Sequence, residues 1–82
     1  DNPESRIAKF VLDMFDVQKD KLFTEDKPHI SFTHEEISQR LGLVRETVTR
    51  HLNKFKRSRM LDLKSHQIIL LNKKALERIG KR

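Results

Sequence analysis

The side chains best suited to specific chemistry lie in one short segment, residues 45–50, with the sequence RETVTR. At about 100° per residue, a helix through this segment has its polar and apolar side chains on opposite faces. Arginine can donate two hydrogen bonds to guanine O6 and N7, and a carboxylate can accept from the cytosine amino group. The polar face holds Arg45, Glu46, Thr49 and Arg50, and the apolar face holds Val48, Leu52 and Phe55. This composition is typical of a helix end that reads base edges in duplex DNA.

The polar face also has a simpler interpretation. Glu46 and Arg50 are one helical turn apart and could form a solvent-exposed ion pair, worth only about 0.2–0.5 kcal/mol. An acid on a DNA-facing surface weakens binding through phosphate repulsion, however, so Glu46 is better explained as a base reader. A glycine-containing turn before the segment and strand-like runs after it favour base reading.

Charge is distributed unevenly along the 82 residues, whose formal net charge is +6. Residues 1–39 carry five Lys and Arg against nine Asp and Glu, whereas residues 40–82 carry thirteen against three. A basic half of this kind is typical of a nucleic-acid-binding surface. By itself, the charge would fit a membrane surface or an acidic protein partner equally well.

Several other classes of site are not expected. The chain has no Cys, which excludes disulfides and thiolate metal sites and fits a reducing cytoplasm. Its four His show no pair at metal-ligand spacing on one helical face, so no metal or other cofactor is predicted for this domain. Without a nucleophile elbow or a Gly-rich phosphate loop, and with little room for a pocket, an enzyme is not expected. No apolar run approaches the ~20 residues of a membrane span, and no signal-peptide pattern opens the chain.

The first half of the chain contains signals for two helices. Asn2-Pro3 is typical of a helix start, and the apolar spacing that follows predicts a helix over about 3–18. Residues 19–29 are charged and aperiodic and predict a loop, after which residues 29–32 form a short extended segment. A second helix opens at Thr33, where Glu36 completes a capping box, and ends at Gly42 in the left-handed conformation.

The second half predicts a further helix followed by a hairpin. The helix covers about 45–58, directly after a three-residue turn. Residues 60–64 and 67–71 are strand-like and are separated by Ser65-His66, although neither residue is the Gly or Asn that tight turns prefer. The chain then ends with a helix over about 73–79, capped by Asn72 and closed by Gly80.

Two helices joined by a tight turn, over about 33–58, form a helix-turn-helix, and the hairpin over about 60–71 forms a wing. No linker or repeat divides the chain. We therefore predict one domain over residues 1–82, mainly α with a small antiparallel β wing: a winged helix-turn-helix.

The segment LGLVRETVTRHLNKFKRSRMLDL resembles the C-terminal DNA-binding domain of the Crp–Fnr transcription regulators. The resemblance covers nearly the whole chain. SRIAKFVLDMF is similar to the helix that leads in from the family's dimerisation helix, ISFTHEEISQRLG to its strand and first motif helix, and residues 60–71 to its wing. The resemblance implies sequence-specific binding of double-stranded DNA, with the helix over about 45–58 in the major groove.

By position, the resemblance assigns Arg45, Glu46 and Arg50 to base edges. Thr49 stands where the family commonly has Gly or Ser, so it could add a base contact or only crowd the groove, and it is kept as a candidate base contact. The predicted phosphate contacts are Thr33, His34, Thr47, Lys54, Lys64 and His66. Val44 departs from the Ser or Thr with which the family caps this helix, and loss of that cap should cost about 1 kcal/mol of helix stability.

The basic run after the polar face has two interpretations. Its cations could follow the phosphates, or they could be a solvated helix end that suits the helix dipole. The run comprises Lys54, Lys56, Arg57 and Arg59. The second interpretation is favoured for Arg57 and Arg59, and Lys54 is kept as a candidate phosphate contact.

The resemblance also implies partners beyond this chain. Because family members carry a sensor barrel and a long dimerisation helix, the chain is interpreted as the C-terminal fragment of a longer bacterial, cytoplasmic regulator. We expect that parent to be a homodimer that binds a palindromic operator and contacts RNA polymerase, with half-sites of the TGTGA or TTGAT type. The isolated domain is expected to be a monomer.

Fold does not determine function, and an alternative keeps the fold while changing the role. Winged helices also serve as RNA-binding or protein–protein interaction modules. A protein-docking helix would have apolar anchors in place of the Arg-Glu-x-x-x-Arg face.

Overall fold

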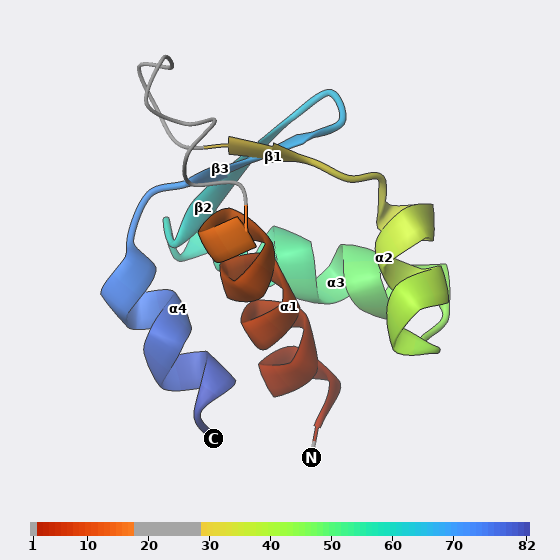
Figure 1. Ribbon diagram of the computed structural model, residues 1–82, viewed down its shortest axis with the longest axis horizontal. Helices are drawn as coiled ribbons and strands as arrows, with labels where there is room; N and C mark the ends of the chain where they lie inside the picture. The colour runs from red at the N-terminus through yellow and green to blue at the C-terminus, as the bar shows by residue number, and fades with distance from the viewer. Residues whose placement is uncertain (1, 18–28) are drawn as a thin grey trace.

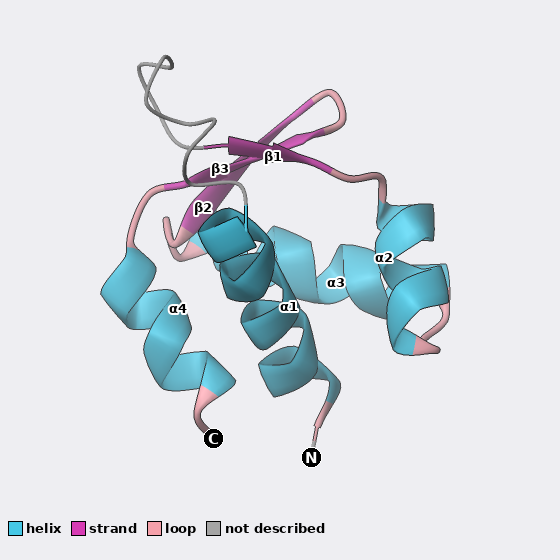
Figure 2. Cartoon of the chain, in the orientation of Figure 1, coloured by secondary structure: helices cyan, strands magenta, loops and turns pink. Residues whose placement is uncertain are grey.

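The computed structural model describes residues 2–17 and 29–82, which form four helices and three short strands (Figures 1 and 2). The elements in chain order are α1 Pro3–Val17, β1 His29–Ser31, α2 His34–Leu41, α3 Arg45–Arg57, β2 Leu61–Lys64, β3 Gln67–Leu70 and α4 Lys73–Gly80. The predicted order and type of these elements are confirmed, with small shifts at their ends. The loop predicted over 19–29 lies, except for its last residue, outside the described residues.

A three-stranded antiparallel sheet with the order β1-β3-β2 lies along one side of the helices (Figure 2). The predicted hairpin is its β2-β3 part, in which Leu63 pairs with Ile68. The predicted extended segment becomes β1, and its Ile30 also pairs with Ile68. Because β1 joins the hairpin directly, the wing is fastened to the residues that precede α2.

The core lies between α1, α3, α4 and the sheet. Figure 1 shows α1 crossing in front of α3, with α4 alongside α1. The helices α1, α3 and α4 each contribute several apolar side chains to this space, and α2 and the three strands contribute one each. The buried apolar residues are Ile7, Ala8, Val11, Phe15, Ile30, Ile37, Val48, Leu52, Phe55, Leu61, Ile68, Leu76 and Ile79. None of the described helices has the length and apolar character needed to cross a membrane.

The connection between α2 and α3 confirms the predicted helix-turn-helix geometry. At the start of α2, Thr33 Oγ1 accepts from the N–H of Glu36 at 3.0 Å, and Glu36 Oε1 accepts from the N–H of Thr33 at 2.8 Å. At its end, Gly42 has φ 67°, in the left-handed region, and its N–H donates to the carbonyl of Ser38. These caps satisfy backbone groups at both ends of α2 and set the direction in which the chain enters α3.

The end of α4 is shifted by one residue from its predicted position. Gly80, which was predicted to close the helix, is its last residue, and Lys81 follows as the C-cap with φ −90°. A Cβ at Gly80 would lie 3.6 Å from the backbone of Lys9, at ordinary van der Waals distance. Gly80 thus lies at the contact between α4 and α1, where a small side chain would also fit.

The start of α3 generates a stability prediction. Val44 is its N-cap, with φ −76° and ψ 149°, is 68% exposed, and makes no side-chain cap hydrogen bond. Serine fits this backbone and would accept from an unpaired N–H of the first turn, so Val44→Ser should raise the free energy of unfolding by about 1 kcal/mol. Urea unfolding measures this, with Val44→Ala as the control. Equal stability of the serine and alanine variants would contradict the capping argument.

Candidate nucleic-acid interface

Helix α3 has one buried apolar face and, at its leading end, one exposed polar face, as predicted. Val48, Leu52 and Phe55 have no exposed surface. Arg45, Glu46 and Arg50 are exposed. The burial of the apolar face therefore directs the predicted base-reading side chains into solvent together.

Thr49, also predicted as a base contact, lies at the border between the two faces of α3. It is half-buried, and its Oγ1 shares a 2.8 Å hydrogen bond with Nδ1 of His34, the first residue of α2. Burial lowers the pKa of His34, and the positive charge of Arg45 lowers it further. Thr49 thus ties the two helices of the motif together, a role that the sequence pattern did not indicate.

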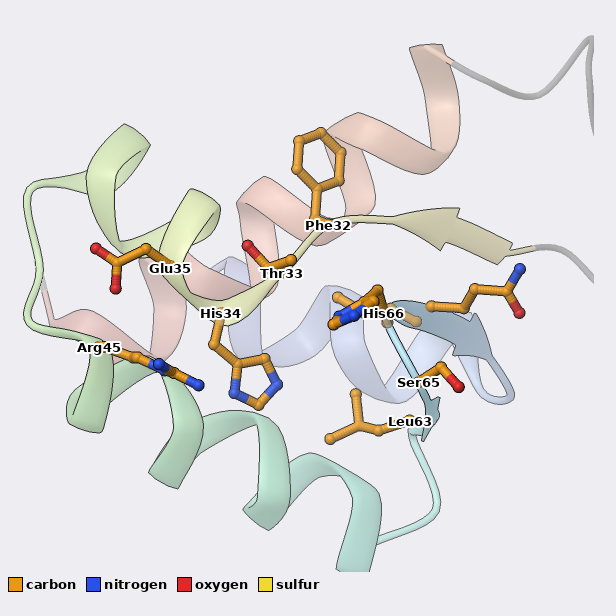
Figure 3. Close-up of a pocket in the computed structure, with 10 residues that line it drawn as sticks. Phe32, Thr33, His34, Glu35, Arg45, Leu63, Ser65 and His66 are labelled. Carbon is orange, nitrogen blue, oxygen red and sulfur yellow. The ribbon is translucent and has the colours of Figure 1, made fainter.

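A cleft of about 390 Å³ opens between the start of α2, the start of α3 and the hairpin (Figure 3). Four predicted contact residues line it: Thr33, His34, Arg45 and His66. Figure 3 shows the side chain of Arg45 extending from α3 along one side of the cleft, with His66 on the opposite side. The structure therefore brings together residues that are up to 33 positions apart in the sequence, counted from Thr33 to His66.

The remaining hairpin residues lie at the tip of the wing. Lys64 and His66 are exposed, on either side of Ser65, which has φ 52°. The N–H of Phe32 donates to the carbonyl of His66 at 3.1 Å, so the wing tip is attached to the residue before the α2 cap. The wing can therefore hold Lys64 and His66 at a fixed position relative to α2.

Two other predicted phosphate contacts, Thr47 and Lys54, lie on α3. Thr47 is half-buried. Lys54 Nζ donates to Glu4 Oε2 at 2.5 Å, so this ammonium group already has a partner within the protein. Neither observation tests a DNA contact: Thr47 stays a predicted phosphate contact, whereas Lys54 could reach a phosphate only by leaving Glu4.

Glu4 is a residue that the sequence reasoning missed. Its Oε1 accepts from Arg82 Nη1 at 3.2 Å, and His51 Nδ1 lies 4.0 Å from its Oε2. The hydrogen bond from Lys54 is the main cause that lowers the pKa of Glu4; burial opposes the shift, and the nearby positive charges reinforce it. Partners 50 and 78 positions away leave no local pattern that could have revealed this role.

Arg6, one helical turn from the start of α1, was missed for the same reason. Its Nη2 donates to the carbonyl of Leu41 at 2.5 Å, at the C-terminal end of α2. A cation at this position satisfies a carbonyl that has no partner within the helix and suits the helix dipole. Together, Arg6 and Glu4 join the first turns of α1 to both helices of the helix-turn-helix.

Across 2–17 and 29–82, no group of three or more His, Asp and Glu side chains is placed to hold a metal ion. The histidines instead serve other contacts: His34 bonds Thr49, and His51 lies beside Glu4.

The helix pair, the tight turn and the β2-β3 hairpin define a winged helix-turn-helix domain. A model of the Crp-like helix-turn-helix domain matches residues 5–79. The chain therefore belongs to the Crp–Fnr family of DNA-binding transcription regulators.

Individual relatives agree with this assignment. The fumarate and nitrate reduction regulatory protein of Yersinia pestis is 30% identical over 79 residues, which cover 96% of this chain and 32% of the relative. A transcriptional regulator of the family from Eubacterium rectale superposes with a TM-score of 0.77 at 28% identity, over 99% of this chain and 34% of the other. One from Thermus thermophilus gives 0.82 at 25% identity, over 99% and 41%. The chain spans between 32% and 41% of the length of these three proteins.

The histidines at the interface generate a prediction about pH. Burial lowers the pKa of His51, and the charge of Arg50 lowers it further while Glu4 partly opposes the shift. The pKa of His34 is lowered as well, so the unfolded chain binds more protons than the folded chain near pH 6. The free energy of unfolding should therefore fall as the pH drops through the unfolded histidine pKa, about 6.5.

Urea unfolding between pH 7.5 and pH 5.5 measures this loss. The lowered carboxyl pKa values of Glu4 and Glu36 act only at more acidic pH, so they do not contribute in this range. A combined His34→Gln and His51→Gln variant should lose less stability over the same range, and an unchanged pH dependence would contradict the assignment.

Proposed function

We propose that this domain binds double-stranded DNA sequence-specifically, with the leading end of α3 in the major groove. The observation that carries the proposal is the exposed side-by-side placement of Arg45, Glu46 and Arg50 on α3, next to a cleft that the wing and α2 border. Arginine and carboxylate groups together match the edges of a G·C base pair. Thr49 lies at the edge of this set, where it can contact a base beside its hydrogen bond to His34.

The cleft and the wing supply the backbone contacts in this proposal. Phosphate groups would bind to Thr33 and His34 at the start of α2, to Lys64 and His66 on the wing, and to Thr47 on the far flank of α3. The N-terminus of α2 contributes free N–H groups and a positive dipole end, which favour an anion. Such contacts position the protein on the duplex and carry no sequence information.

The proposal extends to a longer protein, built like the relatives, of which this domain would be one part. In it, the domain would work in the cytoplasm of a bacterium as part of a homodimeric regulator, without a cofactor of its own. Two domains would read the halves of a palindromic operator about one helical turn apart. By resemblance, the half-sites would be of the TGTGA or TTGAT type, and RNA polymerase would be a further partner.

The salt dependence of binding tests whether the function is binding of a nucleic acid. If a half-site complex engages on the order of 4–6 phosphates, the log–log slope of affinity against salt should be about −4 to −5. Fluorescence anisotropy on a labelled duplex at several salt concentrations gives the slope, with the same RNA sequence as the control. Affinity that is indifferent to salt, or that is equal for RNA, would overturn the proposal in favour of another winged-helix role.

Three variants test the division between base and phosphate contacts, on a duplex selected from a random library and on its scrambled version. Arg50→Ala should cost about 1–3 kcal/mol on the selected site and much less on the scrambled one. Glu46→Ala should relax the preference at one base pair. Lys64→Ala should weaken both duplexes equally and flatten the salt slope by about one phosphate. Equal losses on both duplexes for Arg50→Ala and Lys64→Ala would show that α3 does not read the sequence.

A further inference from the structure

The first turn of α1 holds a carboxylate to which three distant side chains converge. Glu4 accepts from Lys54 of α3 at 2.5 Å and from Arg82 at 3.2 Å, one on each carboxylate oxygen. The side chain of Glu4 is only 12% exposed, whereas that of Lys54 is 56% exposed. Because both of its oxygens are hydrogen-bonded, the carboxylate of Glu4 keeps one orientation. Its Oε2 therefore stays in place to accept from Lys54.

Lys54 occupies a position on α3 from which it could contact DNA. It lies one helical turn beyond Arg50 and two turns beyond Thr47, the proposed base and phosphate contacts. Its long side chain carries a mobile charge that binds a phosphate as readily as a carboxylate. Glu4 and a DNA phosphate are thus alternative partners for the same ammonium group.

We propose that Glu4 is a positioning residue that withholds Lys54 from the DNA backbone and so limits the number of phosphates that the domain engages. The inference rests on the proposed function. Phosphate contacts strengthen binding to every sequence alike and increase its dependence on salt. Glu4 therefore lowers the sequence-independent part of the affinity and leaves base reading unaffected.

Glu4→Gln tests the proposal, because glutamine keeps the size of the side chain and removes its charge. Asp13→Asn is the matched control: it removes one negative charge from an exposed position of the same helix. Anisotropy on the selected and scrambled duplexes gives affinities and salt slopes for both variants in the 82-residue chain, alone and combined with Lys54→Gln.

We expect Glu4→Gln to steepen the log–log salt slope by about 0.9, the value for one additional phosphate contact. At 0.1 M salt, the affinity for both duplexes should rise roughly three- to eightfold, while the ratio between them stays unchanged. The effect should disappear in the Lys54→Gln background. In the otherwise unchanged chain, Lys54→Gln should alter the slope far less than Lys64→Gln does.

Several results would overturn the proposal. These are equal effects of Glu4→Gln and Asp13→Asn, a Glu4→Gln effect that persists without Lys54, or a large slope change on Lys54→Gln alone. Partial unfolding cannot imitate the expected result, because it lowers affinity, and urea unfolding of each variant monitors it. Failure of the proposed function has a different signature: the unchanged chain then binds without salt dependence, and Arg50→Ala leaves binding on both duplexes unchanged.

Discussion

The domain depends on one division within α3: one face is completely buried and the opposite face is in water. Val48, Leu52 and Phe55 have no exposed surface, and burial of a side chain of this size contributes on the order of 1.5–3 kcal/mol. Rotation of α3 about its axis would expose them, so the helix is held at one angle by the core. The same constraint keeps Arg50 outward, which means that the energy of the core also orients the reading face.

The angle between α2 and α3 is held by polar contacts rather than by the core alone. Gly42 turns the chain in the left-handed conformation, and the hydrogen bond between His34 and Thr49 joins the helices at their N-terminal ends. Arg6 binds the carbonyl of Leu41 at the opposite end of α2. The turn at Gly42 and the His34–Thr49 hydrogen bond join α2 to α3, and Arg6 joins α2 to α1, so α2 is held against both neighbouring helices.

The features that were predictable from the sequence are those with a local signal. The capping box of Thr33 and Glu36, the turn at Gly42 and the apolar spacing of α3 are short patterns, and the structure confirms all three. The pairing of β1 with β3 and the contacts of Glu4 and Arg6 were not predictable, because they join residues that are distant in the sequence. Gly80 was also a local signal, and α4 ends at this residue, one position later than predicted. The predicted contact residues gather at the cleft, the wing and α3, yet no side-chain pattern revealed that Thr49 and Lys54 also have partners inside the protein.

Those internal partners reduce the number of cations in the strongly basic second half of the chain that are available to bind DNA. Its thirteen Lys and Arg residues do not form one surface. Lys54 and Arg82 are bound to Glu4, and the guanidinium of Arg40 lies 5.3 Å from the centre of the Phe32 ring. The basic residues of α4 belong to a helix that packs beside α1 (Figure 1). Net charge therefore overstates the number of cations available to a duplex bound at α3, because part of it stabilises the packing of α1 and α3 and part of it faces elsewhere. For a small basic domain, the contacts that acidic residues make with each cation are a better guide to its DNA-binding surface than the sum of its charges.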